Sequence, residues 1–285
     1  MSIITIEQEL CRKCGLCSAV CVDDVFAKAN PGEFPQVAKE KNCFSCGHCV
    51  SVCPNNAIKH KRLRNENIRP IGSKTLEPEV MENFLRSKRS ARHFKKTEVE
   101  KGIIIRLLHI AQQAPSDANS QDRRYIVVTD PQKIEELEKN VVKYYKSLLF
   151  WMKYPVRKFL DLFTPNLIRE LEKILPDFTG MVKKYQLGER PVFRNAPCII
   201  FICANKGNVM GKDNCIIAQD YLMLQAETMG LGSCVIGNAT GAPGSIAKSL
   251  KIAKEQQVYA AIILGYPEYF FVRGVDRQDP EVKWL

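Results

Sequence analysis

Eight of the twelve cysteines lie within residues 11–53 and repeat one spacing. Both runs follow C-x2-C-x2-C-x3-C, the first with Cys11, Cys14, Cys17 and Cys21 and the second with Cys43, Cys46, Cys49 and Cys53. Three thiolates at this spacing can wrap one face of an iron–sulfur cube, while the fourth cysteine of each run ligates the other cube. The spacing therefore predicts two [4Fe–4S] clusters.

Zinc and disulfide bonds are the alternatives for these cysteines. A structural zinc site pairs two C-x2-C knuckles and needs four ligands in total, so the third cysteine of each run is surplus to zinc. The first residues show no basic segment followed by an apolar run, so we expect no secretory signal and a reducing, cytoplasmic setting. Reduced, metal-binding thiolates are the favoured interpretation.

Residues 1–60 resemble the bacterial two-cluster ferredoxin domain. The assignment that follows gives one cluster Cys11, Cys14, Cys17 and Cys53, and the other Cys43, Cys46, Cys49 and Cys21. Gly15 and Gly47 suit a backbone that turns tightly around a cube. Val22 stands where the family pattern has proline, and His48 is expected to tune a cluster without ligating it.

Three polar or glycine-rich segments follow in the larger remainder of the chain. Cations and a hydroxyl at 88–92 suit a phosphate, amides at 114–121 suit a polyol, and glycines at 230–238 expose backbone N–H groups. Taken singly, each has an ordinary explanation: a solvated basic surface, the loop after a helix, or a turn and strand.

Together the segments resemble the nitroreductase family of FMN enzymes over residues 78–285. The matching motifs are Arg89-Ser90-Ala91-Arg92-His93-Phe94, Ala114-Pro115-Ser116-Asp117-Ala118-Asn119-Ser120-Gln121, Gly230–Gly237, and Leu264-Gly265-Tyr266-Pro267. After Gln121 the family often has proline and an aromatic residue, whereas this chain has Asp122 and Arg123.

The resemblance implies an FMN site and a homodimer with the flavin at the subunit interface. The implied flavin-binding residues are Arg89, Ser90, Arg92, Pro115, Ser116, Asn119, Gln121, Ile236 and Gly237, with Arg277 and, as a further candidate, Arg273 reaching the phosphate. The flavin carries the chemistry in such sites, so no acid–base catalytic residue is expected.

Apolar periodicity predicts the elements that position these residues. Helices are expected at 77–86, 98–113, 131–153 and 213–229, and strands at 125–129, 198–203 and 258–264, with an irregular segment over 154–190. The stripe Ile103, Leu107, Ile110 and Ala114 marks the buried face of the second helix. Helices alternating with a few apolar strands indicate an α+β domain, and the family resemblance implies a mostly antiparallel central sheet flanked by helices.

The predicted organisation is a cluster domain over 1–60, a basic linker over 61–77 and an FMN domain over 78–285. Within the last, 140–190 is a candidate lid whose aromatic residues either cover the flavin or pack into the core. These aromatics are Tyr144, Tyr145, Phe150, Trp151 and Phe159. Cys198, Cys203 and Cys215 are expected to be buried thiols. Cys234 lies near the proposed ring-binding turn and is not expected to act directly, and His60, His93 and His109 receive no role.

The net charge of +11 lies entirely beyond residue 60, because acidic and basic residues balance before it. The excess is either a basic soluble surface or an attraction for anionic partners such as a flavin phosphate, a nicotinamide cofactor or an acidic electron carrier. No DNA-binding pattern and no membrane-length apolar segment is present, so neither nucleic acid nor a membrane is an expected partner.

The favoured function is an oxidoreductase in which electrons from a ferredoxin or flavodoxin pass through the clusters to FMN and reduce a nitro compound, quinone or activated alkene. One alternative is NAD(P)H reducing the flavin directly, with electrons leaving through the clusters. No Rossmann G-x-G-x-x-G motif is present, so a nicotinamide would have to use the flavin pocket. Another alternative is a redox sensor or electron relay without small-molecule turnover.

Overall fold

The computed structural model describes residues 2–63, 68, 70–72, 76–152 and 165–285, with side chains from residue 172 onward in the last range. The chain divides into two compact units. Unit 1 comprises Met1–Leu76 and Asp117–Ser120, and unit 2 comprises Glu77–Ser116 and Gln121–Leu285. In the described ranges no helix is long and apolar enough to cross a membrane.

Unit 1 is built around a two-stranded antiparallel ribbon and two short helices. Strand β1 (Ile4–Ile6) pairs with β2 (Ile58–His60), so that Ile4 lies opposite His60. Helices α1 (Leu16–Ala19) and α2 (His48–Val52) each begin directly after a glycine at which the chain turns, between the second and third cysteines of a run. Gly15 and Gly47 hold that turn in the left-handed region, at φ +74° and +80°, which confirms the expectation for both glycines.

Unit 2 is organised around a four-stranded antiparallel sheet in the order β3-β4-β6-β5. The strands are β3 (Arg124–Val128), β4 (Cys198–Asn205), β5 (Gly232–Val235) and β6 (Gln256–Gly265). The two central strands are almost fully buried, because helices cover both faces. The predicted α+β class with a mostly antiparallel sheet is confirmed.

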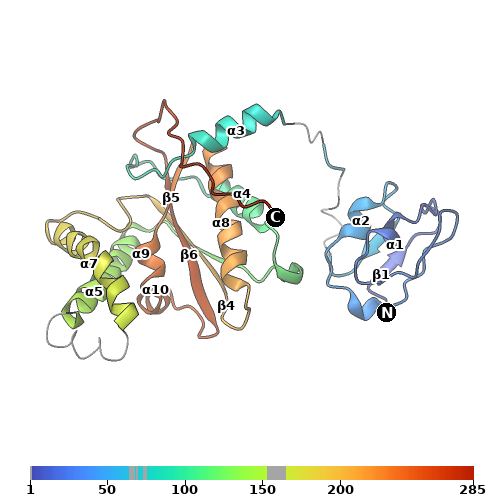
Figure 1. Cartoon of the computed structure of the whole chain (residues 1–285), viewed down its shortest axis with the longest axis horizontal. Coiled ribbons are helices and arrows are strands. Elements are labelled where there is room, and N and C mark those ends of the chain that lie inside the picture. The colour runs from blue at the N-terminus through green and yellow to red at the C-terminus, as the bar shows by residue number, and fades with distance from the viewer. Residues whose placement is uncertain (1, 64–67, 69, 73–75, 153–164) are drawn as a thin grey trace. The chain divides into compact units, whose positions relative to one another are not determined.

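Successive residues of β4 point to opposite layers. Ile199, Phe201 and Cys203 join one core, and Cys198, Ile200 and Ile202 join the other. On one face lie α4 (Lys101–Gln112) and α8 (Gly211–Thr228), and on the other lie α5 (Pro131–Trp151), α7 (Pro165–Gln186), α9 (Gly237–Thr240) and α10 (Pro243–Ser249). Figure 1 shows α5 and α7 side by side on the face of the sheet away from α8. Helix α3 (Pro78–Ser87) lies at the start of unit 2.

Two sequence-based expectations need correction. Of the predicted stripe, Leu107 and Ala114 are buried, whereas Ile103 and Ile110 are only half-buried. The fully buried positions beside Leu107 are instead Ile104 and Ala111. The irregular segment predicted over 154–190 is wrong where the structure describes it, because α7 is a long helix despite the internal Pro176. Proline costs a helix one hydrogen bond, and burial of Phe178, Met181 and Val182 after it offsets this loss.

Candidate metal centres and cofactor site

Two small cavities in unit 1 are each lined by four cysteines. One is lined by Cys11, Cys14, Cys17 and Cys53, and the other by Cys21, Cys43, Cys46 and Cys49. The short helices α1 and α2 carry the chain from one cavity to the other, so that the fourth cysteine of each run faces the cavity of the other run. Each group of four cysteines is the ligand set predicted from the sequence for one cluster. That these cysteines ligate iron–sulfur clusters stays a prediction.

The donors in each cavity suit an iron–sulfur cluster. Four soft thiolates are the standard ligands of a [4Fe–4S] cube, whereas among the described residues no three His, Cys, Asp or Glu side chains converge as ligands of a single metal ion. Burial, with smaller contributions from the neighbouring Cys46 and Cys43, raises the pKa of Cys49 to about 11. The free Cys49 thiol therefore holds its proton near neutral pH, so cluster binding must release it.

His60 contacts the second cavity, although the sequence analysis gave it no role. It is 1% exposed at the end of β2, and its Nε2 lies 3.3 Å from Cys43 Sγ. The backbone N–H of Arg62 donates to His60 Nδ1 at 3.2 Å. Because Nδ1 accepts that bond, the ring proton lies on Nε2 and points at the sulfur. Alternation along β2 was the available signal, since Ile58 and His60 share one face of the strand.

In unit 2 the backbone brings three of the four family motifs together. The N–H of Ala91 donates to the carbonyl of Ser233 at 3.0 Å, and the N–H of Lys95 donates to Tyr266 at 2.8 Å. Glu268 closes the arrangement by donating to the carbonyl of His93 at 3.1 Å. The arginine motif therefore lies between β5 and the segment that follows β6.

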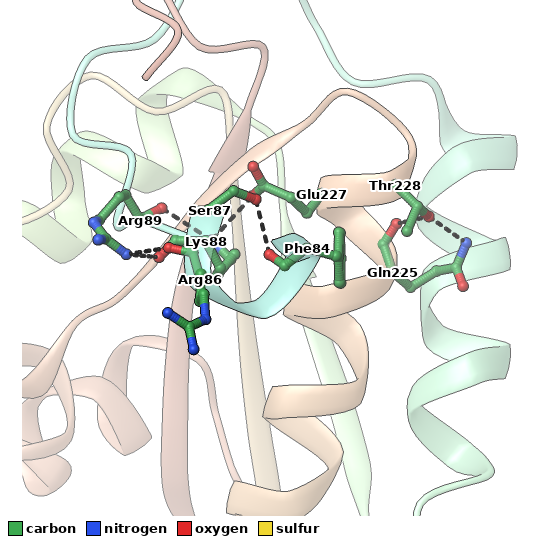
Figure 2. A network of polar contacts seen from close by, with 8 residues as sticks. All are labelled: Phe84, Arg86, Ser87, Lys88, Arg89, Gln225, Glu227 and Thr228. Carbon is green, nitrogen blue, oxygen red and sulfur yellow. Dashed lines mark hydrogen bonds and ion pairs between the residues drawn. The ribbon is translucent and has the colours of Figure 1, made fainter. Parts of the chain in front are cut away.

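Figure 2 shows that the adjacent basic side chains Lys88 and Arg89, at the start of the first motif, point in different directions. Lys88 Nζ lies 3.2 Å from a carboxylate oxygen of Glu227 near the end of α8. Arg89 turns the other way, donating to the carbonyls of Arg86 at 2.8 Å and Val275 at 2.5 Å. Arg86 in turn pairs with Asp276 at 3.1 Å. Arg89 and the C-terminal segment that carries Arg273 and Arg277 are thus brought together.

The second motif lies elsewhere in the sheet. It immediately precedes β3, whose first residue Arg124 is opposite Cys203 on β4, whereas the first and fourth motifs lie near the Cys198–Leu264 pair. Cys203 and Cys198 are five residues apart on β4, so the second motif and the other motifs are separated by about 17 Å along the strand direction. In addition, β3 and β5 are opposite edges of the sheet. Gln121 is therefore not brought to Arg92 within one chain.

The loop of the second motif has an unusual backbone. Ala118, Asn119 and Gln121 all have positive φ, and the N–H of Gln121 donates to Ser116 Oγ at 3.0 Å. Asn119 belongs to unit 1, where its Nδ2 donates to the carbonyl of Ser45 at 2.6 Å. Pro115 is exposed, and its carbonyl accepts a bond from Arg123.

A cavity of about 580 Å³ lies beside the first and third motifs in unit 2. Arg92, His93 and Asn238 line one part of its wall, and the second half of α7 with residues 189–195 lines the rest. Ile236 donates its N–H to Ala261 at 2.8 Å, within the sheet. Gly237 is the first residue of α9, where helix geometry leaves an N–H without an intrahelical acceptor.

The candidate lid residues fall into three groups. Tyr145 is buried, and its hydroxyl donates to the carbonyl of Asn238 at 3.1 Å, so it supports the wall of this cavity. Tyr144, Phe150 and Trp151 are exposed. Phe159 lies outside the described residues. The cysteines predicted to be buried, Cys198, Cys203 and Cys215, are all buried, and so is Cys234.

Comparison with known proteins divides the chain in the same way. A family model described as the nitroreductase family matches residues 85–266, and one described as a 4Fe-4S dicluster domain matches residues 10–58. A ferredoxin of Methanothermococcus thermolithotrophicus is 38% identical over 60 residues, which cover 97% of that protein and 20% of this chain.

The larger part has more distant relatives. An iodotyrosine deiodinase of Thermotoga neapolitana is 20% identical over 189 residues, covering 66% of this chain and 89% of that protein. The structure of a nitroreductase with bound FMN from Desulfitobacterium hafniense DCB-2 has a TM-score of 0.53 and 17% identity, covering 74% of this chain and all of that one. At that identity the likeness shows the fold.

Proposed function

Because the chain belongs to the nitroreductase family and carries a ferredoxin-type dicluster domain, we propose that it relays electrons through two [4Fe–4S] clusters to FMN, which reduces a small organic acceptor. The proposed division is a cluster domain over 1–60, a linker over 61–77 and a flavin domain over 78–285. When bound, the clusters supply one-electron transfer and FMN supplies hydride or one-electron chemistry.

One observation carries the flavin part of this proposal. The first, third and fourth family motifs converge through backbone hydrogen bonds beside a cavity of about 580 Å³, a volume suited to a cofactor or small substrate. Arg92 and Asn238 face that cavity from two of the converging motifs. Basic, amide and backbone N–H donors are the groups that a flavin phosphate and ring edge require.

The chain's own residues take the following proposed roles. Arg89, Ser90 and Arg92 bind the phosphate and the ring edge, and Arg277 with Arg273 reaches the phosphate. Because the N–H of Ile236 is bonded to Ala261 within the sheet, the N–H of the adjacent Gly237 is the one that faces the reactive part of the ring. Pro115, Ser116, Asn119 and Gln121 complete the flavin contacts. Tyr145 is buried, and it positions Asn238 by donating its hydroxyl to the backbone carbonyl of that residue.

A homodimer is part of the proposal, because the site is incomplete in one chain. The second motif precedes the edge strand β3, far from Arg92 near the opposite edge. A second copy can supply Gln121 and Ser116 to the Arg92 side of the site, as in a closed two-fold assembly.

Stopped-flow spectroscopy tests the electron route. Anaerobically purified protein is first assayed for iron, sulfide and FMN, and is then mixed with a reduced ferredoxin. We expect flavin reduction to follow cluster reduction, and steady-state turnover of a nitroarene, quinone or activated alkene. A flavin that stays oxidised under these conditions contradicts the relay.

The matched control is a double variant, Cys14→Ala with Cys46→Ala, which removes one exposed ligand from each cavity. It should keep FMN, still accept electrons from dithionite at the flavin, and lose reduction by ferredoxin. Reduction of the flavin by NAD(P)H alone in this variant would favour the alternative in which electrons leave through the clusters. Absence of turnover with every acceptor would favour a sensor or relay.

A further inference from the structure

The cavity beside Arg92 has a cationic wall that the proposed flavin chemistry does not use. Its charged lining residues are Arg92, Lys184, Arg190 and Arg194, against Asp177 and Glu189. Three of these cations lie on the wall formed by α7 and residues 189–195, away from the family motifs. Arg190 is held by Glu135 of α5 at 2.5 Å. No described carboxylate lies within ion-pair distance of Lys184 or Arg194, although the charge of Arg194 favours the ionised form of the buried Glu138 and so opposes the effect of burial, which raises the pKa of that carboxyl.

The backbone that presents this wall is unusual and firmly held. Arg194 and Asn195 are consecutive left-handed residues, at φ +54° and +55°. Such conformations persist only where neighbouring structure enforces them, and they concentrate at functional sites. The two residues just before them are held by Glu138, a fully buried carboxylate on α5 that accepts the N–H groups of Val192 at 2.8 Å and Phe193 at 2.9 Å.

Helix α7 leaves room in front of this wall. Asp177, Gly180, Met181 and Lys184 recur at steps of three and four, so they share the face of the helix that lines the cavity. A Cβ atom added at Gly180 would meet nothing within 4 Å. Glycine weakens a helix interior, so the position sacrifices helix stability and keeps the cavity open.

We infer that this wall binds the carboxylate of the acceptor, so that the substrate is a small planar compound carrying an anionic group. The inference rests on the proposed function, because it places the substrate against the same cavity as Arg92. Lys184 and Arg194 bind the carboxylate through charge-assisted hydrogen bonds, and Met181 and Pro191 contact the apolar body.

A matched pair of ligands tests the charge directly. Binding of benzoate and of its neutral isostere benzamide to the oxidised holoprotein is measured by calorimetry, and turnover is measured with 4-nitrobenzoate and 4-nitrobenzamide. We expect at least about a tenfold preference for the anion. The preference should disappear in the double variant Lys184→Gln with Arg194→Gln, while the neutral ligand is bound as before.

Two further variants serve as controls. Lys183→Gln removes a neighbouring cation that does not line the cavity, and should leave the preference intact. Gly180→Leu fills the open face and should weaken both ligands alike. Equal binding of benzoate and benzamide by the wild type overturns the inference, and turnover of both nitro compounds would still support the proposed function. Loss of FMN from the double variant also overturns it, since the cations would then hold the cofactor phosphate.

A second inference rests on a separate observation in unit 1. His60 directs its Nε2 proton at Cys43 Sγ, whereas the structure shows no side-chain donor, among the described residues, to Cys11 at the corresponding place in the first run. A hydrogen bond to a ligand sulfur stabilises the more electron-rich, reduced cluster. We infer that His60 is a positioning residue that raises the reduction potential of the cluster bound by Cys43, so that the two clusters differ.

A redox titration monitored by electron paramagnetic resonance tests this difference. In His60→Leu, one of the two midpoint potentials should fall while the other is unchanged, with iron and sulfide content as in the wild type. His60→Gln, which keeps a donor, should recover part of the shift. Two unchanged potentials, or equal shifts of both, overturn the inference. So does loss of the cluster from both variants, because His60 would then be needed only for folding.

Discussion

At the scale of single residues, Arg123 explains how this chain departs from its family and still forms the loop of the second motif. The buried guanidinium donates to the carbonyls of Gln112 at 3.2 Å, Ala114 at 2.9 Å and Pro115 at 3.2 Å. A cation at the carboxyl end of α4 also complements the helix dipole. Where relatives often have proline and an aromatic residue, this chain stabilises the loop through hydrogen bonds from the Arg123 guanidinium to backbone carbonyls.

We predict that Arg123→Lys destabilises unit 2 by about 2–3 kcal/mol, because one ammonium cannot replace three guanidinium bonds and leaves buried carbonyls unsatisfied. Urea unfolding of the flavin-loaded protein measures the change. Arg124→Lys is the control, because Arg124 is the next residue along the chain and its side chain is exposed. A change below about 0.5 kcal/mol, typical of surface substitutions, would contradict the role of Arg123.

Glu40 is a second residue whose effect follows from its bonds. Its Oε1 accepts the N–H groups of Ile3 at 2.5 Å and Ile4 at 3.0 Å and the hydroxyl of Ser2. These donors, led by Ser2, lower the pKa of Glu40 below its ordinary value of 4.5. While it is charged, the carboxylate therefore stabilises the backbone at the start of β1.

The sign of its pH dependence follows from the lowered pKa. The unfolded chain binds the proton more readily, so the stabilisation from Glu40 is complete above about pH 4.5 and is lost as the pH falls through the folded-state pKa. We predict that the stability difference between wild type and Glu40→Gln is constant near neutral pH and shrinks in acid. Hydrogen exchange at Ile3 and Ile4 measures it, and a difference that grows in acid would contradict the assignment.

At the scale of elements, the contact between the first motif and β5 depends on the missing side chain of Gly232. A Cβ atom there would lie 2.5 Å from Cβ of Ala91 and 3.3 Å from Cβ of Pro267. Both neighbours are short and rigid, so the strand and the motif must move apart.

We therefore predict that Gly232→Ala costs about 1–3 kcal/mol, as overpacking does elsewhere, and releases FMN by displacing Arg92. Thermal unfolding and flavin content measure the two effects. Gly244→Ala is the control, because a Cβ atom on that residue of α10 would meet nothing within 4 Å. Equal behaviour of the two variants would show that the motif does not depend on this close approach.

The elements also show what the sequence could and could not predict. Long apolar runs such as Cys198–Asn205 identify strands by composition alone, and the cysteine spacing identifies the cluster unit. The first position of the α4 stripe was misplaced because Ile103, Ile104 and Ile105 are consecutive, so periodicity does not select one of them. Helix α7 was missed because Pro176 disfavours a helix locally, while the stabilising contacts of Phe178 come from distant parts of the chain.

The candidate site was harder to predict than the elements. The order of the family motifs identified the candidate site residues. The distances between those residues depend on which strands pair and in which register, and no local sequence pattern encodes the pairing. The cationic wall at Arg190 and Arg194 was missed for the same reason. The intervening residues Val192 and Phe193 are held by Glu138, more than fifty positions earlier, through bonds that only the folded chain forms.

At the scale of the whole molecule, the two units should differ in their dependence on iron. Unit 1 has one small core that includes the buried Cys17 and Cys49, whereas unit 2 has two larger cores of its own. A domain of about 60 residues is marginal without a metal or crosslink. Removal of iron by a chelator should therefore expose residues 2–60 to protease while residues 78–285 stay protected and keep FMN. Simultaneous digestion of both parts would contradict this independence.

The assembly of two copies gives the most stringent prediction. Arg92 and Gln121 lie near opposite edges of one sheet, so a flavin site that needs both takes one from each chain. Arg92→Ala and Gln121→Ala homodimers should each lose FMN. In a heterodimer of the two variants, one site keeps both residues and the other lacks both, so about half of the wild-type flavin content should return. Isolation through two different affinity tags and measurement of FMN per dimer test this. A wild-type dimer carrying the same tags is the control, and a heterodimer without flavin would show that each chain builds its own site.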